Sequence, residues 1–396
     1  MALPAPAADA HGPRAYLARC LRGTEWILAA EIETRLSPTT ITLAHRSVRF
    51  TTDSPPPLAS LSLATADDVF LVVADVTGID RTRAGLAYLR ARAHELPWGA
   101  ALAGLKRLRP QASWRAATVT ASHLGRRNYN RYEIEAAVAE AASEGLGLQY
   151  RPSRSPQPHT PELALRVHLE GTRATVAARI FDTPLHRRSY KLTTCSGTLH
   201  PPLAAAMALV AGLRPGSRVL DPFTGVGTIP IEAGRLQPRA RVIGSDIDAE
   251  RIRGASSNAR LAGASATFQV EDAAALPWRR ASFTHVVSNV PWQRAVGLRG
   301  RLASASSARD EEIARVLAYA GRAVLLVDQE DPLVTRNDVG NGMRVVHRSW
   351  LSAFGQHPRL CILARGGEGG DGPIDAGAPW GPALGRWVDK ADTLEP

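Results

Sequence analysis

Five short apolar runs between residues 217 and 329 alternate with helical stretches, and this alternation constrains the fold more than any other feature. The runs are "SRVLDPF", "RVIGSDI", "ATFQVED", "FTHVVSN" and "AVLLVDQ", and two more, "MRVVHRSW" and "PRLCILAR", would close the set. Strands separated by helices pair in parallel through crossover connections. The pattern therefore predicts an α/β fold with a mostly parallel, seven-stranded sheet.

An acidic residue ends each of the first three strands. Asp221 precedes a Thr-Gly-Val-Gly loop and a helix, Asp246 ends the second strand, and Asp272 ends the third. Because parallel strands end at the same edge of the sheet, these carboxylates would line one site, where Asp246 could accept hydrogen bonds from both ribose hydroxyls. Asp272 could accept from an adenine amino group. Phe223 stands where the first glycine of GxGxxG would be, and nothing cradles a pyrophosphate. We therefore expect S-adenosylmethionine rather than NAD.

The fourth strand ends in "SNVPW", residues 288–292. The methyl group of S-adenosylmethionine is already activated, so the protein must position an acceptor in line with it. An exocyclic base amine is a poor nucleophile, because its lone pair is delocalised into the ring. The Asn289 oxygen and a neighbouring backbone carbonyl could accept the two amine hydrogens and localise that lone pair. Pro291 would stiffen the turn, and Trp292 could stack on a flipped base.

The first 181 residues have a different pattern. Residues 14–80 suggest a strand, a helix and further strands, and a helix at 81–96 follows. Next come an alternating strand, the Arg-bearing loop "LGRRNYN", a helix closed by glycine, and a hairpin that ends near Phe181. This half therefore predicts two small α+β units.

Composition excludes several classes of protein. Arginine and lysine outnumber acidic residues by 48 to 37, and the net charge of +11 makes a polyanion a plausible partner. The cysteines, at positions 20, 195 and 361, show no ligand spacing, which argues against a disulfide framework or a metal site. The chain has neither a signal-peptide pattern nor a membrane-length apolar run. We expect a soluble, cytoplasmic protein without a metal.

The ordered motifs "DPFTGVGT", "SDID", "VED" and "NVPW" resemble those of Rossmann-like methyltransferases that act on exocyclic amines. The stretch from "WRAATVTASHLGRRNYNRYEIEAAVAEA" to "RATVAARIFDTPLHRRSYK" is similar to a THUMP domain that runs into its methyltransferase. The opening "YLARCLRGTEWILAAEIE" resembles the ferredoxin-like domain that precedes THUMP in tRNA guanosine-N2 methyltransferases. The resemblance covers roughly residues 14–365. It implies a ferredoxin-like domain (14–80), a THUMP RNA-binding domain (81–182), a linker (183–198) and a Rossmann-like methyltransferase domain (199–366).

The resemblance also implies roles for single residues and a tRNA substrate methylated on the N2 of a guanosine. The residues implied to be catalytic are Asn289, Pro291 and Trp292. Those implied to bind S-adenosylmethionine are Asp221, Thr224, Gly225, Gly227, Asp246, Ile247, Asp272 and Ala273. Val290 replaces the first proline of the usual Asn-Pro-Pro-aromatic motif, but this position contributes its backbone carbonyl, which valine retains.

Basic residues in two loops are candidates for contacts with RNA phosphates, although each also fits a solvated surface charge. They are Arg126, Arg127, Arg187, Arg188 and Lys191. His186 and His200 have no ligand-spaced partner and are expected to be structural. The Gly/Pro-rich segment 367–396 is predicted to be disordered.

Several alternatives stay open. Ribosomal RNA or a DNA adenine could be the acceptor, although the THUMP-like region argues against DNA. A non-catalytic RNA-binding protein that retains the fold is favoured by Val290 and by the missing first glycine. A small-molecule methyltransferase would leave the first half unexplained. Taken singly, Asp246 and Asp272 could be helix caps and Trp292 a packing residue.

Overall fold

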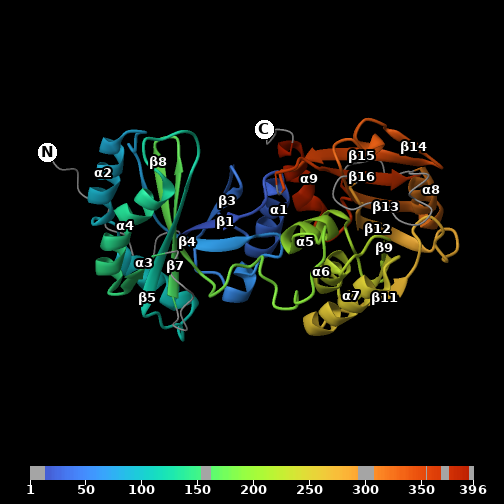
Figure 1. Ribbon diagram of the computed structural model, residues 1–396, viewed down its shortest axis with the longest axis horizontal. Helices are drawn as coiled ribbons and strands as arrows, with labels where there is room; N and C mark the ends of the chain where they lie inside the picture. The colour runs from blue at the N-terminus through green and yellow to red at the C-terminus, as the bar shows by residue number, and fades with distance from the viewer. Residues whose placement is uncertain (1–13, 153–161, 293–306, 354, 367–373, 392–396) are drawn as a thin grey trace.

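The computed structural model describes residues 14–152, 162–292, 307–353, 355–366 and 374–391, which form an N-terminal and a C-terminal lobe side by side (Figure 1). Each lobe is built on an eight-stranded sheet. None of the helices in these ranges is long and apolar enough to cross a membrane.

The N-terminal lobe holds a mixed sheet in which β5 pairs in parallel with β6 and β7, and the other pairs are antiparallel. Its spatial order is β2 (Thr40–Ala44), β3 (Ser47–Thr52), β1 (Arg14–Arg19), β4 (Asp68–Val76), β8 (Arg173–Arg179), β7 (Glu162–Glu170), β5 (Ala116–His123) and β6 (Gln149–Arg151). The pairing of β4 with β8 carries the sheet past residue 80. The two α+β units expected from the sequence therefore share one continuous sheet.

In Figure 1, helices α2, α3 and α4 lie on the side of this sheet away from the C-terminal lobe, and α1 lies next to that lobe. The N-terminal helices are α1 (Glu25–Leu36), the short 3-10 helix η1 (Leu58–Leu61), α2 (Arg83–Ala93), α3 (Trp98–Leu108) and α4 (Arg131–Leu146). A capping box formed by Asn130 and Glu133 begins α4, and Gly147 in a left-handed conformation ends it. The predicted single helix at 81–96 is shorter, and α3 follows it.

The C-terminal lobe has an α/β fold. Its sheet runs in the spatial order β11 (Ala266–Val270), β10 (Arg241–Asp246), β9 (Arg218–Asp221), β12 (Phe283–Asn289), β13 (Leu317–Val327), β16 (Arg359–Arg365), β15 (Met343–Trp350) and β14 (Asp338–Gly340). The first five strands are parallel and the last three pair antiparallel. The sheet is therefore mixed and has eight strands rather than the predicted seven. The extra strand, β14, is a short edge strand that pairs with β15.

Several helices accompany this sheet. They are α5 (Pro201–Val210), α6 (Thr228–Leu236), α7 (Ala249–Ala262), α8 (Ser307–Val316), η3 (Pro332–Val334), α9 (Gly381–Trp387) and η4 (Val388–Lys390). The prediction of disorder is wrong for residues 374–391, which contain α9. Leu384 is buried in the core of the C-terminal lobe, and Trp387 Nε1 donates to Glu33 Oε2 of α1 at 2.7 Å. The buried leucine and this hydrogen bond outweigh the Gly/Pro-rich composition around them. Residues 367–373 and 392–396 lie outside the described ranges.

Helix α1 contributes to the cores of both lobes. Leu28 and Ile32 belong to the apolar core of the N-terminal lobe. Trp26 and Ile27 are fully buried in the core of the C-terminal lobe, which also contains Met207 of α5. A shared apolar core holds two units in one orientation far more firmly than a polar contact does.

Candidate active site

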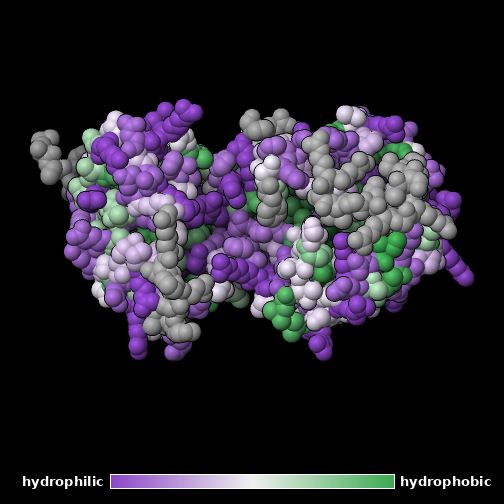
Figure 2. Space-filling model, viewed as in Figure 1, coloured by the Kyte–Doolittle hydropathy of each residue, from purple (hydrophilic) through white to green (hydrophobic). Residues whose placement is uncertain are grey.

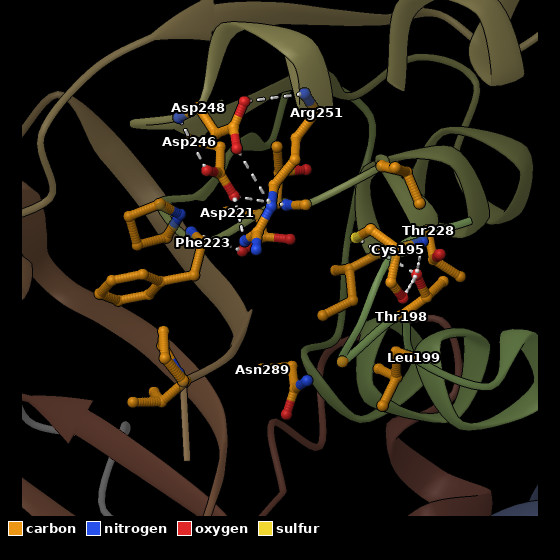
Figure 3. Close-up of a pocket in the computed structure, with 18 of the residues that line it drawn as sticks. Cys195, Thr198, Leu199, Asp221, Phe223, Thr228, Asp246, Asp248, Arg251 and Asn289 are labelled. Atoms are coloured by element: carbon orange, nitrogen blue, oxygen red, sulfur yellow. Dashed lines mark hydrogen bonds and ion pairs between the residues drawn. The ribbon is translucent and has the colours of Figure 1, made fainter. Parts of the chain in front are cut away.

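A cavity of about 230 Å³ opens at the carboxyl edge of the parallel strands β9, β10, β11 and β12 (Figure 3). The loops after these strands line it, together with Gln356 and residues 195–199, at the end of the segment predicted to be a linker (183–198). Every residue predicted to be catalytic or cofactor-binding lines this cavity except Gly227. The sequence motifs therefore converge on one site.

The glycine loop between β9 and α6 needs glycine for its backbone conformation. Gly225 and Gly227 have φ values of +54° and +86°, in the left-handed region. A Cβ at Gly227 would also lie 3.0 Å from the Ala255 Cβ and from the Phe268 ring. Gly227 therefore shapes the turn into α6 from behind the cavity wall.

The Asp246 carboxylate is held in place by the backbone around it. Its Oδ2 accepts from the Gly225 N–H and its Oδ1 from the Asp248 N–H, both at 3.0 Å, and Arg251 Nη1 lies 3.6 Å from Oδ2. Asp248, not Asp246, caps α7 by accepting from the Glu250 and Arg251 amides. The helix-cap alternative for Asp246 is therefore wrong, and its carboxylate lines the cavity. Ile247 beside it is 41% exposed.

Asp221 is a buried carboxyl group at the cavity floor. Ser288 Oγ donates to its Oδ1 at 2.5 Å, and the Phe223 N–H donates at 3.2 Å. Burial raises the pKa of Asp221 to about 7 in spite of the hydrogen bond from Ser288, and the nearby Asp246 charge adds to the rise. The site therefore has a carboxyl group that titrates near neutral pH.

Asp272 forms a hydrogen bond within its own turn and also lines the cavity. Its Oδ1 accepts from the Ala274 N–H at 3.0 Å, which fits the capping alternative, although the residues after it form a turn rather than a helix. Asp272 and the buried Ala273 both line the cavity.

Asn289 and Trp292 each have a buried polar atom without a hydrogen-bond partner among the described residues. Asn289 lies across the cavity from Asp246 and Arg251 in Figure 3. Asn289 Oδ1 and Trp292 Nε1 are buried and have no hydrogen-bond partner among the described residues. An unpaired buried acceptor or donor costs roughly 1–3 kcal/mol, which a ligand with matching groups would recover. Both residues line the cavity, so one acceptor and one donor without a partner lie in its wall.

The other two residues of the motif are largely packed. The Val290 side chain is buried in an apolar core, and its N–H donates to the Leu326 carbonyl at 3.0 Å. This explains why an aliphatic residue is acceptable where the usual motif has proline. Trp292 is half-buried and packs partly against the core that contains α5, as the packing alternative expects.

Sequence patterns missed the residues that hold the linker against the cavity. The fully buried Asn258 of α7 accepts from the Thr193 N–H at 3.2 Å. Its Nδ2 donates to the carbonyls of Thr193 and Val226 at 3.0 and 3.1 Å. Asn258 thus ties the linker to the glycine loop, which places Cys195 and Leu199 at the cavity wall. A single asparagine in a polar helix gave no signal of this role.

Two of the residues predicted to contact phosphates have partners inside the protein. Arg188 Nε donates to Glu232 Oε1 at 3.0 Å, and Nη2 donates to the Ala64 carbonyl at 2.7 Å. Lys191 Nζ donates to the Leu199 carbonyl at 2.8 Å, and burial lowers the pKa of this lysine. Both side chains are bound inside the protein, where they hold the segment around residues 188–199 in place, and their contact with phosphates stays a prediction.

The remaining predicted contacts differ in exposure. Arg127 is half-buried and donates to the carbonyls of Asp80 and Gly171, at 3.2 and 2.6 Å, and its contact with phosphates stays a prediction. Arg126 and Arg187 are exposed. Of the described residues, no group of three or more His, Cys, Asp or Glu side chains is arranged to hold a metal ion.

The chain resembles known methyltransferases in sequence and structure. The family model described as RMKL-like, methyltransferase domain matches residues 188–352. The tRNA (guanine(6)-N2)-methyltransferase of Thermus thermophilus is 30% identical over 261 residues, which cover 62% of this chain and 72% of that protein. The U6 snRNA (guanine-N(2))-methyltransferase THUMPD2 of Bos taurus is 30% identical over 172 residues, 43% of this chain but only 33% of that protein. The crystal structure of TrmN from Thermus thermophilus matches with a TM-score of 0.70 and 26% identity, over 89% of this chain and 99% of that one.

Proposed function

Because the chain belongs to the family of S-adenosylmethionine-dependent RNA guanine-N2 methyltransferases, we propose that it methylates the exocyclic N2 of a guanosine in tRNA. The observation that carries the proposal is that Asn289, whose Oδ1 is buried without a hydrogen-bond partner among the described residues, lines one cavity with Asp221, Asp246 and Asp272. An amide oxygen is a hydrogen-bond acceptor, and the N2 amine of guanine has hydrogens to donate.

The carboxylate side of the cavity suits an adenosine with a cationic tail. When bound, S-adenosylmethionine supplies a methyl group that its sulfonium has already activated. Asp246 would accept hydrogen bonds from the ribose hydroxyls, since two backbone amides fix its orientation. Asp272 would accept from the adenine amino group, and Ile247 with Ala273 would contact the faces of the base. Asp221, with Thr224 and Gly225, would line the floor of the site.

The opposite side of the cavity suits the guanine. Asn289 Oδ1 and the carbonyl of Val290 would accept the two N2 hydrogens, which localises the lone pair of N2 toward the methyl group. Pro291 would keep these two acceptors in a fixed geometry. Trp292 would contact the base with the part of its ring that the core leaves open, and its Nε1 would find a partner in the bound base.

The first half of the chain would select the RNA. We assign residues 14–80 to a ferredoxin-like domain, 81–182 to a THUMP domain, 183–198 to the linker and 199–366 to the catalytic domain. The match to TrmN over 89% of the chain supports an arrangement in which both lobes serve one function. Because the proposed substrate is tRNA, we expect the protein in the cytoplasm.

The test is methyl transfer from labelled S-adenosylmethionine to bulk tRNA from a strain that lacks this protein. Nucleoside analysis of the product should give label in N2-methylguanosine, and the Asn289→Ala variant serves as the matched control. Label in ribosomal RNA alone would mean that the substrate is ribosomal RNA and not tRNA. Label in N6-methyladenosine would mean that the acceptor is the N6 amine of adenosine and not the N2 amine of guanosine. Absence of label from both RNA classes would favour a binding protein that has retained only the fold.

A further inference from the structure

A second cavity, of about 520 Å³, lies where the N-terminal sheet meets the linker and the C-terminal lobe. Four arginines contribute to its wall, and they are Arg19, Arg46, Arg166 and Arg179. They come from β1, the β2–β3 turn, β7 and β8, so the fold gathers them from distant parts of the chain. Hydrophilic residues dominate the narrow waist between the two lobes in Figure 2.

Acidic side chains neutralise only part of this cluster. Asp67 and Asp68 are the acidic residues in the cavity wall. Asp68 is already bound by Arg179 Nε at 2.6 Å, and burial raises the pKa of Asp67 to about 6. Positive charge therefore remains in excess around Arg19, Arg46 and Arg166.

The arginines affect one another and retain unused donors. The pKa of Arg166 is lowered to about 9, mainly by burial and then by the charge of Arg19, and the charges of Arg179 and Arg46 contribute less. Arg166 Nη2 donates to Ser122 Oγ at 2.9 Å. The Nε atoms of Arg46 and Arg166 are buried without a hydrogen-bond partner in the part of the chain that the structure describes. Buried cationic donors left unpaired are costly, and an anion with several oxygens would pair them.

The second cavity adjoins the candidate active site through two shared segments. Leu199 lines the first cavity and its neighbour His200 lines the second. In the same way, Gln356 lines the first cavity, while Ser352 and Gly355 line the second. An anion in the second cavity would therefore lie next to a nucleotide in the first.

We propose that Arg19, Arg46 and Arg166 hold a backbone phosphate of the RNA strand beside the nucleotide that enters the active site. The proposal rests on the proposed function only in taking RNA as the source of the phosphate. Such a contact would position the strand without reading its sequence. In this proposal the three arginines bind the RNA in place of the loop residues Arg127, Arg188 and Lys191, whose side chains have partners within the protein.

The test measures tRNA binding, without S-adenosylmethionine, by the Arg19→Gln/Arg166→Gln variant across a range of salt concentrations. We expect the affinity to fall by about tenfold or more, and the log–log salt slope to fall by about 0.7–0.9 for each phosphate that the variant no longer binds. The control is Arg90→Gln/Arg260→Gln, which removes the same charge from exposed positions on α2 and α7. It should bind tRNA nearly as the wild type does.

Melting temperature and S-adenosylmethionine affinity establish that the variants are folded. Should the double variant not fold, Arg46→Gln provides the same test, because the Arg46 side chain has no hydrogen bond among those found in the described residues. Variants that keep the affinity and salt slope of the control would overturn the proposal. So would inorganic phosphate that raises the melting temperature through these arginines while tRNA affinity stays unchanged. Binding that depends on the arginines, from a protein that methylates no RNA, would instead contradict only the proposed function.

Discussion

Ser288, at the end of β12, donates its hydroxyl hydrogen to the carboxyl group of Asp221, at the end of β9, over 2.5 Å. Both side chains are buried, and β9 and β12 are neighbours in the sheet. The bond therefore joins the first and fourth predicted strands directly beneath the cavity. It stabilises the ionised form of Asp221, but burial dominates and the pKa of this group is still raised to about 7.

We expect the affinity for S-adenosylmethionine to rise between pH 5.5 and 7.5. Above its pKa of about 7, Asp221 is ionised and attracts the cationic cofactor, whereas below that pKa it is neutral. The affinity should change by up to about tenfold per pH unit on the acid side. Calorimetric titration at a series of pH values tests this, with Asp221→Asn as the control that should bind weakly and without the pH dependence. A wild-type affinity that is flat over this interval would exclude Asp221 from the cofactor contact.

The same variant should be more stable than the wild type at high pH. The folded-state pKa of Asp221 lies above its unfolded value of about 4, so its contribution to stability is complete below pH 4 and is lost as the pH rises through 7. Asp221→Asn removes the buried charge, and its advantage at pH 8 should be on the order of a few kcal/mol. Melting temperatures at pH 4 and pH 8 provide the measurement. An advantage of equal size at both pH values would point to packing instead of charge.

Asn289→Ala should remove most turnover and leave cofactor binding nearly intact. The Asn289 oxygen has no partner among the described residues, so its removal should not reduce the melting temperature. If it aligns the acceptor amine, the rate of methyl transfer should fall by roughly 10²–10³-fold, the range for loss of one preorganised polar contact. Single-turnover kinetics with tRNA and a separate cofactor titration test both parts. A parallel loss of cofactor affinity and activity would contradict the assignment.

Asp246→Ala should have the opposite profile and weaken S-adenosylmethionine binding by roughly 10–100-fold, since charged hydrogen bonds to a ribose would be removed. Asp248→Ala is a closely matched control two residues away. Asp248 caps α7, so this variant should lose about 1 kcal/mol of stability but keep its cofactor affinity. Equal cofactor affinity in wild type and Asp246→Ala would instead favour the non-catalytic alternative.

The cavity-lining residues were predictable because parallel strands bring their ends together whatever the rest of the chain does. Asp221, Asp246, Asp272 and Asn289 each follow an apolar run, so strand order alone placed them at one edge. Asp248 shows the limit of this argument. Asp246 and Asp248 both lie between the end of a predicted strand and the start of a helix, so the sequence fits either as the helix cap. The backbone geometry shows that Asp248 caps the helix.

Long-range pairing accounts for most of what the sequence did not predict. Arg188 is a loop arginine in the sequence, yet its partners are Glu232, 44 residues ahead, and Ala64, 124 residues behind. The arginines of the second cavity were overlooked for a related reason. Arg166 occupies one position of an alternating strand, and only the folded sheet shows that it lines the same cavity as Arg19 and Arg46.

The helical segment near the C-terminus gives the final prediction, because its composition indicated disorder and its contacts indicate structure. Leu384 of α9 is 1% exposed and shares a core with Trp26 of α1 and Met207 of α5. Leu384→Ala should therefore lower the free energy of unfolding by about 2–3 kcal/mol. The control, Leu261→Ala, removes a side chain that is 50% exposed and should have little effect. Urea unfolding followed by Trp fluorescence provides the measurement. Equal stability of the two variants would mean that α9 does not pack on α1 in solution, whereas the expected decrease would make this segment part of the core that joins the two lobes.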